Sequence, residues 1–167
     1  MHALYALRMS HSSARFVIVS LVFMLALMFA PRTQAQTPAG TISALSGNVA
    51  IERAGKPVAA AQGTALEVGD KLKTAPNSRV TISLSDGSTL ELSDSSTLVL
   101  TENVLNPDGS RARTKVTLLG GLVRSLVKHD PAGNPNFEVH TPNAVASARG
   151  TMFDVSYQEG QPPPALP

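Results

Sequence analysis

Residues 78–92, SRVTISLSDGSTLEL, decide the fold class because apolar and polar residues alternate on both sides of a short turn. The alternating apolar residues are Val80, Ile82, Leu84, Leu90 and Leu92. A period of two residues is typical of a β-strand that buries one face. The stretch therefore predicts two strands joined by a turn, with these five side chains on one buried face.

The length of that turn decides how the two strands pair. A two-residue loop would place Ile82 opposite Glu91 and put the two apolar stripes on opposite faces. A three-residue loop at residues 85–87, with Gly87 in a left-handed conformation, places Ile82 opposite Leu90. We predict this three-residue loop, because it keeps one face apolar. The alternative is that the two strands turn a corner without pairing directly.

The same alternation recurs in short runs between residues 41 and 157, separated by Gly, Pro, Asn and Asp. Strand starts recur at roughly ten-residue intervals, as in sandwiches, barrels and solenoids. Residues 122–128, LVRSLVK, could form a short helix but are too few to stand alone. We therefore predict one all-β domain over residues 41–157, a twisted β-solenoid or sandwich-like arrangement of short, mostly antiparallel strands.

The N-terminal segment has the pattern of a secretory signal. Arg8 and Arg15 precede the apolar run at residues 16–30, which is shorter than the roughly 20 residues that cross a bilayer. Small residues precede a cleavage point after Ala35. We predict that residues 1–35 are a signal peptide and that the protein is exported to the periplasm or cell envelope. The alternative is an uncleaved anchor, which would be the protein's only contact with the membrane.

The composition excludes several classes of protein. The chain has no Cys, which rules out disulfides and cysteine-bound metals. Three of the 14 Lys and Arg residues lie within residues 1–35, so 11 bases would face all 12 acids after cleavage. This balance does not favour a nucleic-acid partner. Residues 158–167 contain three consecutive prolines and are expected to form a C-terminal tail rather than a strand.

Six sequence blocks occur in an order that resembles the FecR domain. They are Gly47 with Val49 and Ile51, residues 68–74 (VGDKLKT), 78–88 (SRVTISLSDGS), 120–123 (GGLV), 137–144 (FEVHTPNA) and 148–155 (ARGTMFDV). The resemblance covers most of the chain after residue 35. It implies an exported all-β domain that binds or signals rather than catalyses, with no cofactor.

The best-known proteins of this family couple siderophore receptors to cytoplasmic sigma factors. The resemblance therefore implies a partner protein in the envelope and a link to iron–siderophore or sigma-factor regulation. Unlike that regulator, the sequence shows no anti-sigma segment before the apolar run and ends where the regulator continues into a receptor-contacting region. We expect a stand-alone FecR-domain protein.

The residues that match the family motifs are expected to be structural. They are Gly69, Asp70, Asp86, Gly87, Ser88, Thr141, Pro142, Arg149, Gly150 and Thr151. The glycines at 69 and 87 suit turns with positive φ, and the neighbouring aspartates can cap backbone N–H groups. Arg149 is expected to be held by hydrogen bonds inside the protein, where Gly150 kinks one late core strand; a contact with a ligand carboxylate is the alternative.

Arg111, Arg113 and Lys115 alternate along one predicted strand and would place three cations on one face. This face is expected to be solvated and to protect a strand edge, or to contact an anionic envelope polymer or an acidic partner. Glu138 and His140 would lie on one face only as a pair, which is too few ligands for a metal site. No Ser lies in a nucleophile elbow, so we predict no enzymatic activity.

A cell-wall or carbohydrate-binding module is the alternative function. Sheets can form platforms for sugars, but such platforms need exposed aromatic rings. After residue 35 the aromatic residues are Phe137, Phe153 and Tyr157. The sequence therefore favours a protein partner over a sugar.

Overall fold

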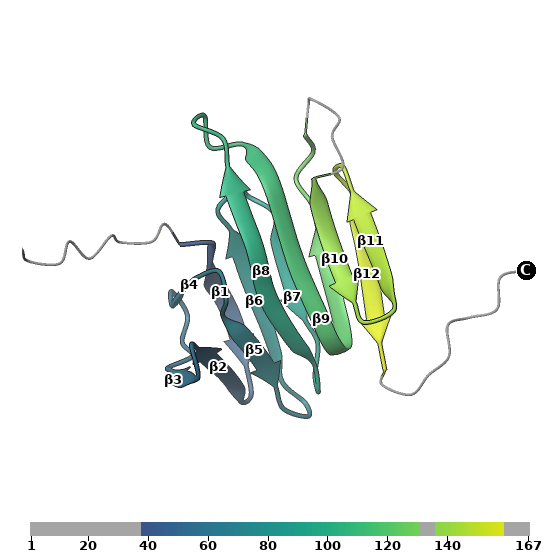
Figure 1. Ribbon diagram of the computed structural model, residues 1–167. Helices are drawn as coiled ribbons and strands as arrows, with labels where there is room; N and C mark the ends of the chain where they lie inside the picture. Colours follow the sequence, from purple (N-terminus) through teal and green to yellow (C-terminus); the bar gives the residue numbers. More distant parts are fainter. Residues whose placement is uncertain (1–37, 131–135, 159–167) are drawn as a thin grey trace, which may run out of the picture. The chain divides into compact units, whose positions relative to one another are not determined.

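The described part of the protein is built entirely from β-strands. The computed structural model describes residues 38–130 and 136–158, and these contain twelve strands and no helix (Figure 1). The strands are β1 (Gly40–Ser46), β2 (Val49–Arg53), β3 (Lys56–Val58), β4 (Ala65–Leu66), β5 (Lys71–Thr74), β6 (Arg79–Leu84), β7 (Thr89–Leu92), β8 (Thr97–Leu105), β9 (Arg111–Leu126), β10 (Phe137–Thr141), β11 (Ala144–Ala148) and β12 (Met152–Tyr157). The predicted all-β fold is confirmed.

The predicted signal peptide and residues 159–167 of the predicted tail lie outside the described residues. Across residues 38–130 and 136–158, no helix has the length and apolarity needed to cross a bilayer.

The strands form two layers that share β9. The front layer has the order β3-β2-β5-β8-β9-β10-β11, and the back layer has the order β4-β1-β6-β7-β9-β12. All of these pairings are antiparallel except β10 with β9. In Figure 1, β8 and β5 lie nearer the viewer than β6 and β7. The sheet therefore curls over on itself around one interior.

Strand β9 passes from the front layer to the back layer at a pair of glycines. Its first part pairs with β8 and β10, and residues from Gly121 onward pair with β7 and β12. Gly121 has a φ of +90°, and a Cβ atom there would collide with the side chain of Ser96. The GG pair therefore supplies both the unusual backbone conformation and the room for this crossing.

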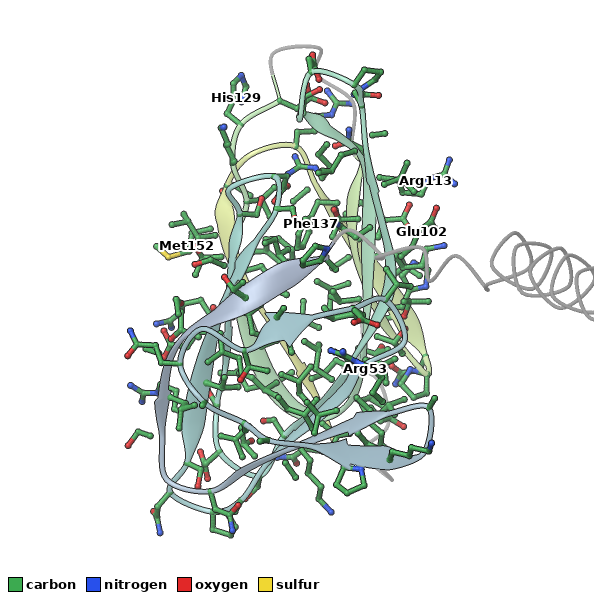
Figure 2. All side chains as sticks on the ribbon, turned by 90° about the vertical axis from the view of Figure 1, so that its left-hand side faces the viewer. Arg53, Glu102, Arg113, His129, Phe137 and Met152 are labelled. Carbon is green, nitrogen blue, oxygen red and sulfur yellow. The ribbon has the colours of Figure 1, made fainter. Side chains whose placement is uncertain are left out.

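The interior is filled by apolar side chains from both layers. Ile82, Leu90 and Val123 of the back layer and Leu98 and Val116 of the front layer belong to one buried cluster. In Figure 2, Phe137 lies between the layers, while Met152 and Arg113 lie on opposite sides of them. The core therefore sits between two sheet faces, as in a sandwich.

The predicted hairpin is confirmed in both register and burial. Ile82 pairs with Leu90, and the loop at residues 85–87 contains Gly87 with a φ of +85°. All five alternating apolar residues are at most 4% exposed. Thr81 and Glu91 are partly exposed on the other face. The corner alternative, in which the strands do not pair, is wrong.

The prediction for the late strand is wrong. Residues 144–157 form two strands, β11 in the front layer and β12 in the back layer, and Arg149 and Gly150 lie in the connection between them. Gly150 has a φ of +151°, and a Cβ atom there would collide with the backbone of His129. The alternation of apolar residues misled the prediction because it continues through a connection that changes layers. Residues 122–126, within the stretch considered for a short helix, belong to β9.

Candidate functional site

Two of the residues that match the family motifs are aspartates buried at turns of the sheet. Asp70 is 0% exposed and Asp86 is 5% exposed. Asp70 accepts a hydrogen bond from the N–H of Glu67, and Asp86 accepts bonds from the N–H and the hydroxyl of Ser88. Gly69 and Gly87 beside them have φ values of 97° and 85°. Each carboxylate therefore holds its own turn, as an Asx-type turn does.

Each aspartate also binds an arginine from a distant strand. Arg53 at the end of β2 donates from Nε and Nη2 to the two oxygens of Asp70, both at 2.7 Å. Arg53 also donates to the carboxylate of Glu67 at 2.6 Å and to the carbonyl of Ala65 at 2.9 Å. The hydrogen bonding of Arg53 to Asp70 is the main reason that the pKa of Arg53 is raised. The arginine thus ties β2 to the turn that precedes β5.

Arg111 is the second of these arginines, and here the sequence prediction is wrong. We expected Arg111 to share a solvated face with Arg113, but its side chain is 3% exposed and bonds the carboxylate of Asp86 at 2.5 Å. It also donates to the carbonyl of Lys128 at 3.1 Å and to the side chain of Asn136 at 2.9 Å. The guanidinium carbon lies 5.6 Å from the ring centroid of Phe137.

A β-bulge explains why Arg111 turns inward. Along β8, Val104 and Leu105 are neighbours, but their partners on β9 are Arg113 and Arg111, so Ala112 is an extra residue. An extra residue shifts the alternation of side chains by one position. The partners Arg53 and Asn136 were not predicted. The signal that could have found them is the burial expected for the turn aspartates, because a buried carboxylate needs a cation or donors.

The remaining cations of the predicted face do lie outside, on the front layer. Arg113 and Lys115 both lie near the carboxylate of Glu102, at 3.5 and 3.7 Å. Figure 2 shows Arg113 and Glu102 side by side on this face. Next to them on β10, Glu138 and His140 form a pair at 2.6 Å. The hydrogen bond from His140 lowers the pKa of Glu138, and the charges of Lys115 and Arg113 contribute.

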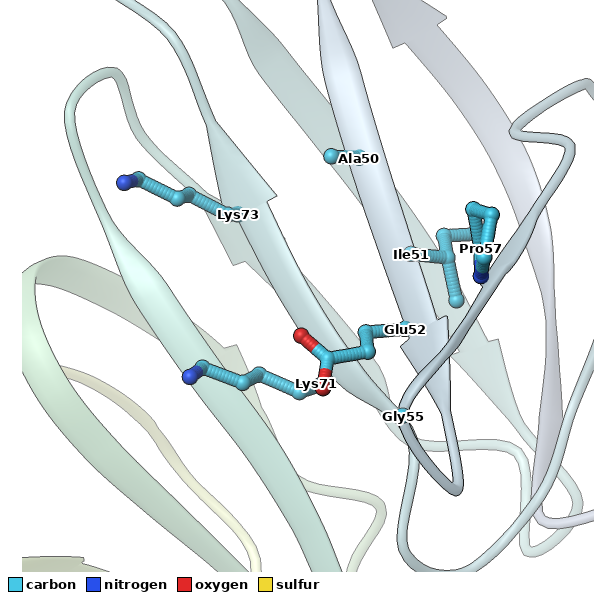
Figure 3. A pocket seen from close by; sticks show the side chains of 7 residues that line it. All are labelled: Ala50, Ile51, Glu52, Gly55, Pro57, Lys71 and Lys73. Atoms are coloured by element: carbon cyan, nitrogen blue, oxygen red, sulfur yellow. The ribbon is translucent and has the colours of Figure 1, made fainter.

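A shallow hollow of about 380 Å³ lies on the same outer face, farther along the front layer. It is lined by residues of β2, the following turn and β5: Ala50, Ile51, Glu52, Gly55, Pro57, Lys71 and Lys73. Figure 3 shows the side chains of Lys71 and Lys73 extending from β5 to the same side. No ion pair between described residues involves either lysine. The hollow also contains one acid, because Glu52 of β2 lies opposite Lys71 in the β2–β5 ladder.

The other motif residues hold turns or lie exposed. Thr141 donates to the side chain of Asn143 and to the carbonyl of Ala144, across the turn that contains Pro142. The backbone carbonyl of Thr151 accepts a hydrogen bond from Val127.

Arg149 is exposed, and its side chain makes no hydrogen bond with the described part of the chain. The prediction that it is clamped inside the protein is wrong.

The described part of the protein is an all-β domain in which most of the buried motif residues hold turns or tie strands together. The family model described as FecR protein matches residues 70–162, more than half of the sequence, so the chain belongs to the FecR family. This family is regulatory and acts in signalling with partner proteins; it is not known as a family of enzymes. Searches of curated proteins and of solved structures gave no match.

Proposed function

We propose that the protein is an exported, non-enzymatic binding module of the cell envelope that recognises an acidic surface of a partner protein. Membership of the FecR family supports a signalling role with a protein partner. The observation that carries the proposal is the hollow on the front layer, where Lys71 and Lys73 form no ion pair with the described part of the chain. Both lysines stand on a short strand held between β2 and β8, which fixes their spacing.

The two groups of cations on this face differ in whether they already form ion pairs within the described part of the protein. Arg113 and Lys115 already share the carboxylate of Glu102, whereas Lys71 and Lys73 have no such partner among the described residues. An acid from a partner would have to displace an ion pair with Glu102 at the first group, whereas at the second group Glu52 lies opposite Lys71 without forming an ion pair with it. We therefore place the main contact at β5.

Chemical cross-linking in the envelope fraction tests this contact. We expect wild-type protein to yield a cross-linked complex that weakens as salt is raised, because exposed charges are screened. The variant with Lys71→Glu and Lys73→Glu should lose the complex without losing its fold. Arg79→Glu, an exposed change on the back layer, is the control and should retain it. An unchanged complex in the Lys71→Glu, Lys73→Glu variant would overturn the proposed contact.

Export is tested separately by the mass of the protein recovered from the envelope fraction. Cleavage after Ala35 gives a chain that begins at Gln36, whereas an anchored form retains residues 16–30. A link to iron–siderophore signalling requires that deletion of the gene alters sigma-factor-dependent transcription when iron is scarce. An unaltered response would leave binding in the envelope but remove the iron link.

The alternative of a carbohydrate module has less support. Phe137 is fully buried, and Phe153 and Tyr157 are half-buried against the core. Phe137 and Phe153 also pack edge to face, with ring centroids 6.3 Å apart. These rings cannot form a flat exposed platform for a sugar. Retention of the protein on insoluble peptidoglycan, unaffected by the lysine changes, would favour the alternative.

A further inference from the structure

The two layers end in four edge strands, and those at one end are better protected than those at the other. At one end, β4 has two residues, and β3 has three residues that include Pro57. Short edges and prolines hinder pairing with another chain. At the other end, β11 and β12 have five and six residues and contain no proline. Each pairs with one strand of the described chain, β11 with β10 and β12 with β9.

Strand β11 differs from β12 because it carries no charge. Its sequence is AVASA, whereas β12 contains Asp154, which binds Arg124 through two hydrogen bonds of 2.9 Å. Charged residues on an edge strand oppose pairing with other chains. Val145 on β11 is also 57% exposed. Thus β11 has neither the short length or proline that protects β4 and β3 nor the charge that protects β12.

The register of the β10–β11 hairpin shows which backbone groups are free. Thr141 pairs with Ala144 across a two-residue turn, so this closing pair exchanges hydrogen bonds. Hydrogen-bonded and non-hydrogen-bonded pairs alternate in an antiparallel ladder. Ala146 and Ala148 therefore bond to β10. The N–H and C=O groups of Val145 and Ser147 point away from it, toward the open edge.

The sequence of β11 is almost the same read in either direction, which suits a second copy of itself. In an antiparallel pair centred on Ala146, each Val145 faces Ser147 of the other copy and exchanges two backbone hydrogen bonds with it. Ala144 then faces Ala148, and Ala146 faces Ala146, so every side chain at the contact is small and uncharged. No like charges meet directly, which would otherwise oppose self-pairing.

We propose that two copies of the protein associate through antiparallel pairing of β11 about a two-fold axis at Ala146. The pairing joins the two front layers into one sheet and covers part of each exposed Val145. Five residues bury less area than a standard interface, so the dimer is weak and forms at high local concentration. The dimer contact at β11 is independent of the proposed partner contact at β5, because the two strands are separated by β8, β9 and β10 in the front layer.

Sedimentation equilibrium over a range of protein concentrations tests the dimer. We expect the mass of the wild type to rise toward twice the monomer mass. Ser147→Pro should stay monomeric, because it removes an outward N–H without removing a bond to β10. The matched control is Ser156→Pro on β12. The carbonyl of Thr151 accepts a hydrogen bond from Val127, which directly follows β9, and bonded and non-bonded pairs alternate along the β9–β12 ladder from that pair. The N–H of Ser156 therefore also points outward. This control should dimerise like the wild type.

Cysteine cross-linking tests the register and does not depend on a proline variant that folds. The chain has no cysteine, so each introduced thiol is the only one. Under mild oxidation Ala146→Cys should form a disulfide-linked dimer, because a non-hydrogen-bonded pair brings the two Cα atoms to about 4.5 Å. Ser156→Cys should not. A wild type that remains monomeric at every concentration, or cross-linking of Ala146→Cys only to another protein, would overturn the proposal.

Discussion

Arg53 with Asp70 and Arg111 with Asp86 repeat one arrangement in two different environments. In both, a buried aspartate holds its own turn and binds an arginine from another strand. The side chain of Arg53 is 29% exposed, whereas that of Arg111 is 3% exposed. If Arg53 is removed, water can solvate part of the Asp70 carboxylate. Water cannot reach the Asp86 carboxylate in the same way. The difference in exposure should set how much stability each arginine provides.

Arg111→Ala should produce the largest loss of stability. The change leaves Asp86 buried without a cation, and losing one partner of a buried ion pair costs about 3 to 5 kcal/mol. Chemical denaturation measures the free energy of unfolding. Arg113→Ala, two residues along and exposed, is the control and should change it by no more than about 0.5 kcal/mol. Equal losses in the two variants would show that the buried network does not hold the fold.

Arg53→Ala should cost less, about 1 to 2 kcal/mol, because Asp70 keeps its bond from Glu67 and gains access to water. The loss should also shrink as salt is raised, whereas that of Arg111→Ala should not. The same denaturation experiment at two salt concentrations measures both effects, with Lys56→Ala as the exposed control. If Arg53→Ala proves as costly as Arg111→Ala, exposure is not what separates the two sites.

The sequence predicted the parts of this arrangement that depend on near neighbours. The loop at residues 85–87 and the buried face of its strands follow from alternation and turn chemistry within a few residues. The arginine partners do not, because Arg111 is 25 residues from Asp86 and turns inward only through the bulge at Ala112. Alternation alone would keep Arg111 on the same face as Arg113. Positions of bulges and layer changes depend on tertiary packing, which the local pattern does not contain.

The pair of Glu138 with His140, whose side chains are each 29% exposed, should contribute less stability than either arginine site. The hydrogen bond from His140 lowers the pKa of Glu138 in the folded protein. The pair therefore adds stability above the pKa of the unfolded chain and loses it as the pH falls through the folded value. We expect Glu138→Gln to reduce the loss of stability between neutral pH and pH values below 4.5, the ordinary value for Glu.

Thermal melts across this pH range measure the effect, which should be small because solvent still reaches both side chains of the pair. The control is Glu52→Gln, an exposed change on β2 that removes the same charge and leaves the Glu138–His140 pair in place. A Glu138→Gln variant whose melting temperature falls with acid as steeply as that of the wild type would contradict the role of the pair.

Arg149→Ala should have the smallest effect of all, although Arg149 belongs to the most conspicuous motif in the chain. Unlike Arg111, its side chain is exposed and has no bonded partner among the described residues, so its removal leaves no buried group unsatisfied. We expect a change in the free energy of unfolding within about 0.5 kcal/mol. The neighbouring Gly150 is needed for a different reason, because the backbone of His129 occupies the space that a side chain would fill. Denaturation of Arg149→Ala beside Arg111→Ala decides the matter: a loss at Arg149 as large as that at Arg111 would mean that Arg149 is held in a buried contact after all.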